Sequence, residues 1–434
     1  MNTLRNQFIY QVFVRNYSKE GTLKEVTKDL KRIKELGADI VYLMPIQPIG
    51  VKGRKGTYGS PYAIKDYTAI SEDLGTIDDF KKLIDEAHKK DLKVMLDIVF
   101  HHTAPDHVWT VEHPDYYVYK NGKMSNKVGE WGDIVDFEYD NNPKLIESLT
   151  QVLEYWVDLG LDGFRFDVAS MLPHEFYQVA FPRIRAKNKD LILLGESIHL
   201  EFNNFLRFNG YHALSDAELY QYYDVLYDYD AHVPYANYLR QDGDLNEMNK
   251  FMHLQEQIYP ANYVKARNIE NHDQPRNRYY TQSDEKTKQW LGYVFFAKGI
   301  AFLNNGVETG NDHINMLFEK DSIDFKHIKK DWVQLIQKLA QLKKDPIMAQ
   351  DKGYKIVSHD KDVLHFEYHN ENEIRVGIFN VGANRGVLEV DLPEGVYKNL
   401  VNDESFEVRF QTIPLMDTPL IFSIDLNNKQ EANH

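Results

Sequence analysis

The alternation of two hydrophobic periods along residues 1–345 constrains the fold more than any other feature of this sequence. Short apolar runs, rich in β-branched and aromatic residues, alternate with longer stretches in which apolar residues recur every three or four positions. Strands that are apolar on both faces and are each followed by a helix are typical of a parallel sheet covered by helices. Repeated units of this kind in a chain of this length favour a closed (β/α)8 TIM barrel over an open, doubly wound sheet. The apolar runs are residues 8–14, 40–44, 94–100, 162–166, 191–194, 264–269 and 300–303.

Two regions depart from this alternation. Residues 102–140 are aromatic and polar and are too long for an ordinary loop after the third strand, which predicts a short inserted subdomain. Beyond about residue 350 the helical period gives way to short alternating runs separated by turn residues, which predicts a C-terminal antiparallel β-sandwich. The predicted domains are a barrel of residues 1–101 and 141–348, an insertion of residues 102–140 and a sandwich of residues 349–434.

The composition excludes several classes of function. The net charge is −15 at pH 7, and a chain this acidic repels nucleic acid and anionic membrane surfaces. There is no cysteine, which excludes disulfides, thiolate metal sites and cysteine nucleophiles. The apolar runs are too short to span a membrane, and the N-terminus lacks the cleavage site of a leader. We therefore expect a cytoplasmic protein without nucleic-acid or membrane partners; nothing in the sequence fixes an oligomeric state.

Polar residues directly after the apolar runs are the candidates for chemistry, because loops at the carboxyl ends of barrel strands carry the active site. Arg165 and Asp167 share one face of a predicted strand, and the rings of Phe164 and Phe166 lie on the other. A guanidinium next to a carboxylate lowers the pKa of the carboxyl, so we expect Asp167 to be ionised, as a nucleophile at a sugar carbon must be. The alternative is a buried ion pair that only ties strands together, and this segment alone leaves both open.

Two further segments place carboxylates after apolar runs. Glu196 follows the run at residues 191–194 with no other charge nearby in sequence, which favours a raised pKa and proton donation near neutral pH. The alternative is a glutamate that caps the next segment or pairs with a helix. Asp273 and His272 follow the run at residues 264–269, where they can bind neighbouring hydroxyls of a sugar. A polar turn capped by Asp273 is the alternative.

The run at residues 94–100 contains Asp97 and is followed by two histidines, His101 and His102. Consecutive strand residues point to opposite faces, which argues against a zinc site built from both imidazoles. Strict alternation groups Asp97 with His101, whereas a turn at the strand end groups Asp97 with His102. The sequence leaves both open.

Taken in order, these segments resemble the four motifs of the α-amylase family of glycoside hydrolases. The motifs are segments 97–102 (DIVFHH), 163–169 (GFRFDVA), 195–197 (GES) and 271–273 (NHD). The resemblance implies that Asp167 is the nucleophile, Glu196 the general acid/base and Asp273 the group that stabilises the transition state. It spans about residues 5–310, and the β-rich tail fits the family's C-terminal domain.

Other positions are similar to the family's substrate-binding residues. The segment Gly59-Ser-Pro-Tyr62 resembles the one whose tyrosine stacks on the sugar beside the bond to be cut. The same resemblance implies that His102, His272 and Arg165 hold sugar hydroxyls or tune the nucleophile Asp167. The substrate-binding residues implied in this way are Tyr62, Asp97, His102, Arg165, His272 and Arg276.

The resemblance implies no required cofactor, and we do not expect the family's structural calcium. His101 stands where the family usually has an Asn that gives an oxygen to this ion, and imidazole is a poor ligand for calcium. We therefore predict no metal-binding residues.

The resemblance implies a retaining α-glucan hydrolase that cleaves α-1,4 bonds of malto-oligosaccharides through a covalent glycosyl-enzyme. A transglycosylase or an α-1,6-glucosidase of the same family is the alternative. A non-catalytic sugar-binding protein with this fold is a further alternative, but the chain keeps all three carboxylates. A barrel lyase or isomerase would need a lysine at a strand end, and none stands at the strand ends singled out here.

Overall fold

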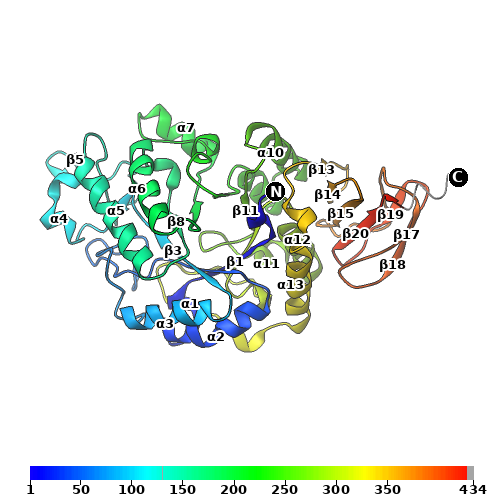
Figure 1. The fold of residues 1–434 in the computed structure, drawn as a ribbon, viewed down its shortest axis with the longest axis horizontal. Helices are drawn as coiled ribbons and strands as arrows, with labels where there is room; N and C mark the ends of the chain where they lie inside the picture. Colours follow the sequence, from blue (N-terminus) through cyan, green and yellow to red (C-terminus); the bar gives the residue numbers. More distant parts are fainter. Residues whose placement is uncertain (130, 428–434) are drawn as a thin grey trace. The chain divides into compact units, whose positions relative to one another are not determined.

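The computed structural model describes residues 1–129 and 131–427 (Figure 1). Eight parallel strands form a closed barrel in the order β1-β12-β11-β10-β9-β8-β3-β2, which confirms the predicted fold class. The strands are β1 (Phe8–Val12), β2 (Ile40–Leu43), β3 (Lys93–Ile98), β8 (Gly163–Phe166), β9 (Ile192–Gly195), β10 (Val225–Tyr227), β11 (Lys265–Arg267) and β12 (Ile300–Asn304). Only β10 was absent from the predicted strands, because its three apolar residues are too few to show a period.

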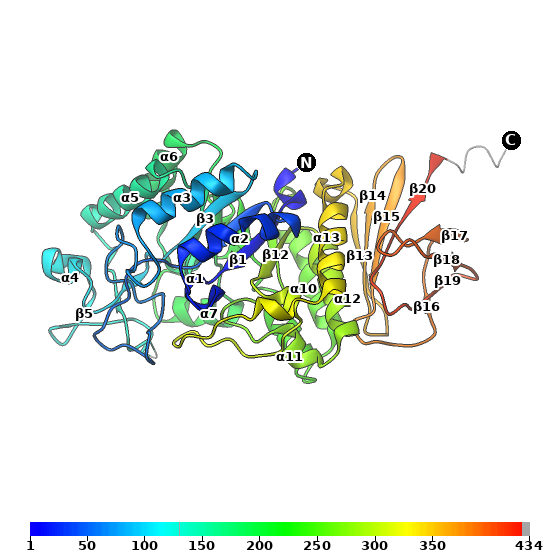
Figure 2. The same cartoon turned by 90° about the horizontal axis from the view of Figure 1, so that it is seen from below.

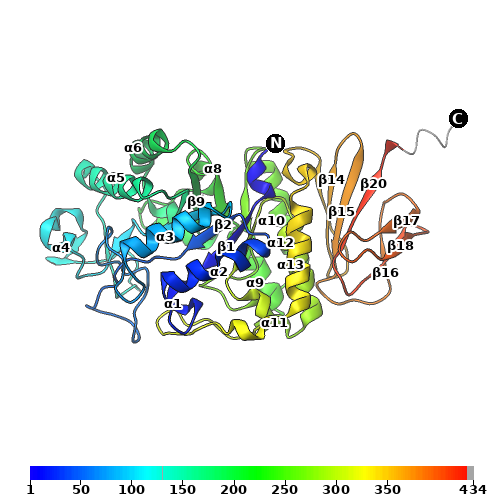
Figure 3. The ribbon, with the colours of Figure 1, turned by 60° about the horizontal axis from the view of Figure 1, so that its bottom comes forward.

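The longer helices have one apolar stripe each. On α2 (Leu23–Glu35) this stripe includes Leu23 and Leu30, which are fully buried, and α3 (Ile77–His88) begins with the predicted cap at Thr76. Figure 3 shows α2 and α3 side by side. The other helices of at least eight residues are α5 (Pro143–Asp158), α6 (His174–Lys187), α7 (Leu200–Phe208), α9 (His232–Leu239), α10 (Leu245–Ile258), α12 (Asp284–Phe296) and α13 (Lys330–Lys343). The short ones are α1 (Val14–Tyr17), α4 (Trp109–Glu112), α8 (Asp216–Leu219) and α11 (Asn277–Thr281).

The chain divides into two compact parts. The first part comprises Ile9–Tyr227 and Asn315–Phe325, and the second comprises Met1–Phe8, Asp228–Ile314 and Lys326–His434. Within the first part, β1, β2, β3, β8, β9 and β10 pair in parallel, each with its neighbour in this order. Within the second part, β11 pairs with β12. The division falls between β10 and β11.

Residues 102–140 of the first part form small antiparallel pairs. The strand β4 (His102–Thr103) pairs with β7 (Val135–Asp136), and β5 (Tyr119–Lys120) pairs with β6 (Lys123–Met124). Aromatic rings fill the space beneath them: Tyr67 lies 5.3 Å from Trp109 and 6.4 Å from Phe137, measured between ring centroids. The aromatic character of this segment therefore reflects packing of its own small core.

The C-terminal region belongs to the second part and is antiparallel, as predicted. Its main sheet has the order β13 (Tyr354–Val357), β14 (Leu364–His369), β15 (Glu373–Phe379) and β20 (Leu420–Asp425). Two antiparallel strand pairs, β16 (Val387–Glu389) with β19 (Thr412–Pro414) and β17 (Gly395–Lys398) with β18 (Ser405–Val408), share one apolar core with that sheet. Figure 2 shows β13, β14 and β15 next to α12 and α13. Residues 428–434 of the predicted sandwich lie outside the described residues.

Among the described residues, no helix has the length and apolar character that crossing a bilayer requires.

Candidate active site

Three neighbouring strands of the first part bring their polar ends together. In the pairing of β3 with β8, Asp97 lies opposite Arg165. The backbone N–H of Asp167 donates to the carbonyl of Ile98, and the N–H of Glu196 donates to the carbonyl of Phe166, at 2.9 and 3.0 Å. The parallel register therefore places the predicted nucleophile and the predicted acid/base at adjacent strand ends, where sequence order alone could not put them.

A single guanidinium contacts three carboxylates at these strand ends. Nη1 of Arg165 lies 2.8 Å from Oδ1 of Asp97 and 3.0 Å from Oδ1 of Asp167. Its Nη2 lies 2.9 Å from Oε1 of Glu196. The Arg165 side chain is fully buried, so these contacts are made away from bulk water. The predicted ion pair of Arg165 with Asp167 is present, and Glu196 and Asp97 belong to the same group.

Burial and the charges of neighbouring groups together set the acid–base properties of this group. Burial by itself lowers the pKa of Arg165, but the charges of Asp97 and Glu196 outweigh it and hold that pKa well above its ordinary value. Burial raises the pKa of Asp167 well above its ordinary value; the charge of Arg165 opposes this shift, and the carboxylates of Glu196 and Asp97 add to it. The expectation that Arg165 makes the net shift of Asp167 downward is therefore wrong, because desolvation outweighs the one favourable charge.

Two tyrosines also contact Asp97. The hydroxyl of Tyr62 donates to Oδ2 of Asp97 at 3.0 Å, and the hydroxyl of Tyr42 donates to the same oxygen. The ring of Tyr62 lies 5.6 Å from the guanidinium carbon of Arg165, so its apolar face is next to the charged group. Asp97 is fully buried, which indicates that it orients Arg165 and Tyr62. Tyr42 was not among the predicted site residues, since an apolar run around it masks its polar end.

Glu196 is held by a strained backbone that the sequence did not reveal. Val168 has φ 38° and ψ 47°, in the left-handed region, which costs about 1–3 kcal/mol for a residue other than glycine. Its N–H donates to Oε2 of Glu196 at 2.8 Å. The two oxygens of Glu196 therefore contact Arg165 on one side and the backbone of Val168 on the other, which fixes the carboxyl group.

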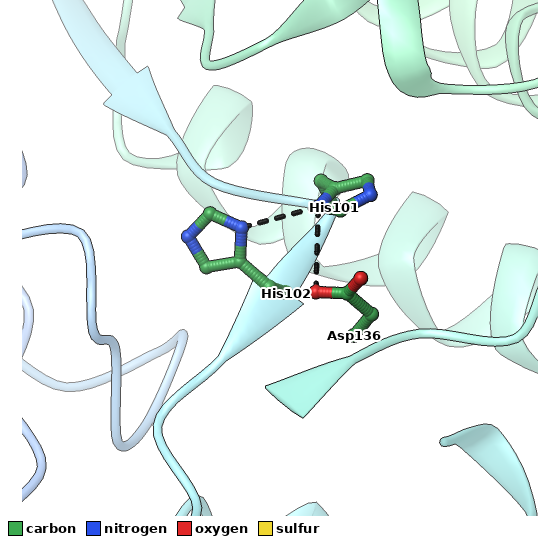
Figure 4. Close-up of side chains that lie close together, drawn as sticks. All are labelled: His101, His102 and Asp136. Carbon is green, nitrogen blue, oxygen red and sulfur yellow. Dashed lines mark hydrogen bonds and ion pairs between the residues drawn. The ribbon is translucent and has the colours of Figure 1, made fainter. Parts of the chain in front are cut away.

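The two histidines after β3 point toward each other (Figure 4). Nδ1 of His101 lies 3.2 Å from Nδ1 of His102 and 3.7 Å from Oδ1 of Asp136. The ring of Trp131 lies 6.2 Å from that of His101 and 5.9 Å from that of His102. Burial lowers the pKa of each histidine to about 3, so both imidazoles are neutral. The strand ends before His101 and the chain turns, so the argument from strict alternation does not apply here.

The loop after β11 carries the remaining predicted residues, in the second part. Nε2 of His272 lies 3.0 Å from Oδ2 of Asp273, whose side chain is 40% exposed. The N–H of Asp273 donates to the side chain of Asn271 at 2.9 Å. Arg276 is buried, with Nη1 2.6 Å from Oε1 of Glu270 and Nη2 donating to a backbone carbonyl at 2.8 Å. The structure thus places Asp273 at an exposed position, whereas Arg276 braces the loop through Glu270, which the sequence analysis did not single out.

Comparison with known proteins identifies both regions of the chain. The α-amylase catalytic domain matches residues 7–132 and 129–352, and the bacterial α-amylase C-terminal domain matches residues 355–422. Among solved structures, an α-amylase from Lactobacillus plantarum is 37% identical with a TM-score of 0.93, covering 98% of this chain and 100% of its own. The maltogenic α-amylase AmyB from Thermotoga neapolitana is 31% identical with a TM-score of 0.85, again covering 98% and 100%.

Curated relatives include enzymes with other activities. An α-1,4-glucan:maltose-1-phosphate maltosyltransferase from Corynebacterium glutamicum is 31% identical over 56% of this chain and 38% of its own length. An oligo-1,6-glucosidase from Bacillus cereus is 25% identical over 51% of this chain and 44% of its own. The chain thus spans less than half the length of these two relatives. The match of the catalytic-domain model to most of the chain shows that it belongs to the α-amylase family of glycoside hydrolases.

Proposed function

We propose that this protein is a retaining α-glucan hydrolase that cleaves α-1,4 bonds of malto-oligosaccharides. One observation carries the proposal: the buried guanidinium of Arg165 contacts the carboxylates of both Asp167 and Glu196. Two carboxyl groups that share one guanidinium are close neighbours. Retaining glycosidases hold their carboxyl pair about 5–5.5 Å apart, whereas inverting enzymes need about 6.5–9.5 Å to admit a water molecule.

The proposed reaction has two steps. Asp167 attacks the anomeric carbon and the bond to the leaving sugar breaks, while Glu196 gives its proton to the departing oxygen. Water then attacks the ester formed on Asp167, and Glu196 takes the proton from that water. The product keeps the α configuration. The attack requires the ionised form of Asp167, because only the carboxylate is a nucleophile.

The other residues bind or orient. The ring of Tyr62 offers the sugar an apolar face, and the hydroxyl of Tyr62 is anchored on Asp97. His102 and His272 hold sugar hydroxyls. Asp273, whose side chain is 40% exposed, accepts hydroxyls of the bound sugar and stabilises the transition state. These roles follow the positions that the family's motifs assign.

The α-1,4 linkage is favoured by the solved structures that cover almost the whole chain. The two solved structures described above, at 37% and 31% identity, are α-amylases. The maltosyltransferases and oligo-1,6-glucosidases match shorter stretches, so transfer to another sugar and α-1,6 cleavage are the second candidates.

A time course of products from maltoheptaose tests the proposal, with Glu196→Gln, Asp167→Asn and the exposed control Glu201→Gln compared with the native chain. We expect only shorter sugars from the native chain and the control, and a fall in kcat of about 10²–10⁴-fold in Glu196→Gln, the range of general acid–base catalysis. Proton NMR of the first product should show the α-anomer.

Each other outcome has a defined meaning. Products longer than maltoheptaose would move the assignment to a transglycosylase, and cleavage of isomaltotriose in its place would move it to an α-1,6-glucosidase. A β-anomer would refute the retaining mechanism. Unchanged activity in Glu196→Gln would refute its role as acid/base.

A further inference from the structure

A cluster of two imidazoles and one carboxylate lies beside the proposed active site, within the first part of the chain. His101 precedes β4, His102 begins it, and Asp136 lies on β7, where it pairs with His102 in the antiparallel register. All three side chains are buried. Figure 4 shows that Nδ1 of His102 and a carboxylate oxygen of Asp136 both face Nδ1 of His101. We infer that this cluster binds a divalent transition-metal ion of the zinc type, which links the turn after β3 to the inserted segment.

The distances suit a tetrahedral ion. Four ligands at about 2.0–2.2 Å from zinc lie about 3.3–3.6 Å from one another. The two Nδ1 atoms are 3.2 Å apart, and Nδ1 of His101 is 3.7 Å from Oδ1 of Asp136. One donor atom from each residue lies within 4.8 Å of the other two. The two distances that involve His101 thus lie close to those of one tetrahedral face, the donor of His102 lies within 4.8 Å of that of Asp136, and a fourth position remains for water.

The carboxylate supplies an independent reason to expect a cation. Oδ2 of Asp136 accepts the backbone N–H of Lys127 at 2.6 Å. Its Oδ1 is buried and has no hydrogen-bond partner among the described residues. Leaving a charged oxygen in that state is costly, and a metal ion on the side facing the imidazoles removes the cost. The Nδ1 atoms of the two imidazoles lie within hydrogen-bond distance of each other, and both nitrogens are good metal donors.

The donor set distinguishes the ion from the calcium that the family resemblance implies. Calcium takes six to eight oxygen ligands, whereas this cluster offers two nitrogens and one carboxylate. His101 stands where the family's oxygen donor is usual, so the residues present do not fit calcium. Imidazole nitrogens suit zinc, nickel and copper. The inferred ion is structural: it orients His102 and the inserted segment, and no step of the proposed reaction passes through it.

Metal titration of the full chain without an affinity tag tests the inference. After dialysis against a chelator, the native protein is titrated with ZnCl2 against a chromogenic indicator and, separately, with CaCl2. We expect one zinc ion per chain, no calcium at equal concentration, and a rise of a few degrees in melting temperature with zinc. Asp136→Asn and His101→Gln should each lower the zinc affinity by more than about 100-fold, since loss of an outer partner alone costs about 10–100-fold.

The control is His88→Gln, which removes a histidine that lies 2.8 Å from the carboxylate of Asp162, outside the proposed cluster. It should leave the zinc affinity unchanged. Equal zinc affinity in Asp136→Asn and the control would refute the site. Calcium binding in preference to zinc, or no zinc binding, would also refute it.

A further test uses the native chain alone, so it still applies if the variants fail to fold. Cobalt in place of zinc should give the intense visible absorption of a four-coordinate site with nitrogen and oxygen ligands. A weak, six-coordinate spectrum would contradict the inferred geometry.

Discussion

At the residue scale, Arg165 contacts three carboxylates with two nitrogens, so a change there alters the charge balance at all of them. Its side chain and that of Asp97 are fully buried, and those of Asp167 and Glu196 nearly so. When one partner of a buried ion pair is removed, the protein loses more stability than the pair contributed, because the remaining charges stay buried without a counter-charge.

Replacing the guanidinium should therefore be severe. Arg165→Met is expected to lower the free energy of unfolding by about 3–5 kcal/mol, the range for one missing partner of a buried ion pair. Arg165→Lys should lower the free energy of unfolding by less, since lysine keeps the positive charge but lacks the planar guanidinium. Chemical denaturation at neutral pH measures both. The control is Arg385→Met, which removes an exposed pair with Asp417 and should change little. Equal effects at the two positions would contradict the description of Arg165.

The pH dependence of activity follows from Asp167. Its pKa is raised, mainly by burial, so the carboxylate needed for attack is lost as the pH falls through a value well above that of an ordinary aspartate. The Asp97 carboxylate contributes to this shift by repulsion. Asp97→Asn removes that charge, so the acid limb of kcat/KM should move to lower pH. A pH profile measured with an activated glycoside tests this, and a shift to higher pH would contradict it.

At the scale of the elements, the sequence predicted the barrel because its strands are apolar on both faces and its helices have a clear stripe. It also predicted that Arg165 and Asp167 lie on the same side of the chain, and the two side chains do meet, although Asp167 follows the last residue of β8. The sequence did not predict the conformation of residues that lie beyond the end of a strand. The convergence of His101 and His102 depends on a turn, and the left-handed conformation of Val168 depends on tertiary contacts that no propensity reports.

The net pKa shift of Asp167 was missed for a related reason. Sequence shows which charge is adjacent, namely Arg165, but not how deeply the pair is buried or which other carboxylates approach. Glu196 and Asp97 come from different strands, and only the parallel register brings them to the same guanidinium. Neighbours along the chain were therefore predicted better than neighbours across the sheet.

Helix α13 contains a buried lysine, Lys343, whose burial should make the stability of the protein depend on pH. Lys343 is 1% exposed, and its Nζ donates to the carbonyl of Ala297 at 3.1 Å. Burial, with smaller contributions from the charges of Arg267 and Arg5, lowers its pKa well below the ordinary value. The folded state therefore disfavours the charged form, and stability should rise with pH between the folded pKa and about 10.4, the pKa of an unfolded lysine.

Lys343→Met should remove this cost. At pH 7 we expect the free energy of unfolding to rise by about 1 kcal/mol or more, because each unit of pKa shift corresponds to about 1.4 kcal/mol. The gain should shrink as the pH approaches 10, where the unfolded lysine also loses its proton. Denaturant titrations at pH 7 and pH 10 measure it, with the exposed Lys330→Met on the same helix as control. A loss of stability at pH 7 would show that the lysine stem fills space that methionine cannot.

At the scale of the whole molecule, the C-terminal sheet is joined to the barrel helices of the second part by close packing. The hydroxyl of Tyr368 on β14 donates to the carbonyl of Phe296 on α12 at 3.0 Å, and the rings of Phe296 and Phe379 lie 5.7 Å apart. Two glycines face these rings. A Cβ at Gly292 would lie 2.6 Å from the ring of Phe379, and one at Gly377 would lie 2.6 Å from that of Phe296.

Close approach, not an unusual backbone angle, thus explains both glycines. Gly377→Ala should force the ring of Phe296 to move and lower the free energy of unfolding by about 1–3 kcal/mol, the cost of overpacking a dense interior. Gly132→Ala is the matched control, because a Cβ there meets nothing within 4 Å. Since the strain arises between β15 and α12, Gly377→Ala should weaken protection from amide hydrogen exchange in α12 as well as in its own strand. Protection lost only in the C-terminal strands, with α12 unchanged, would show that the sheet and the helix do not unfold together.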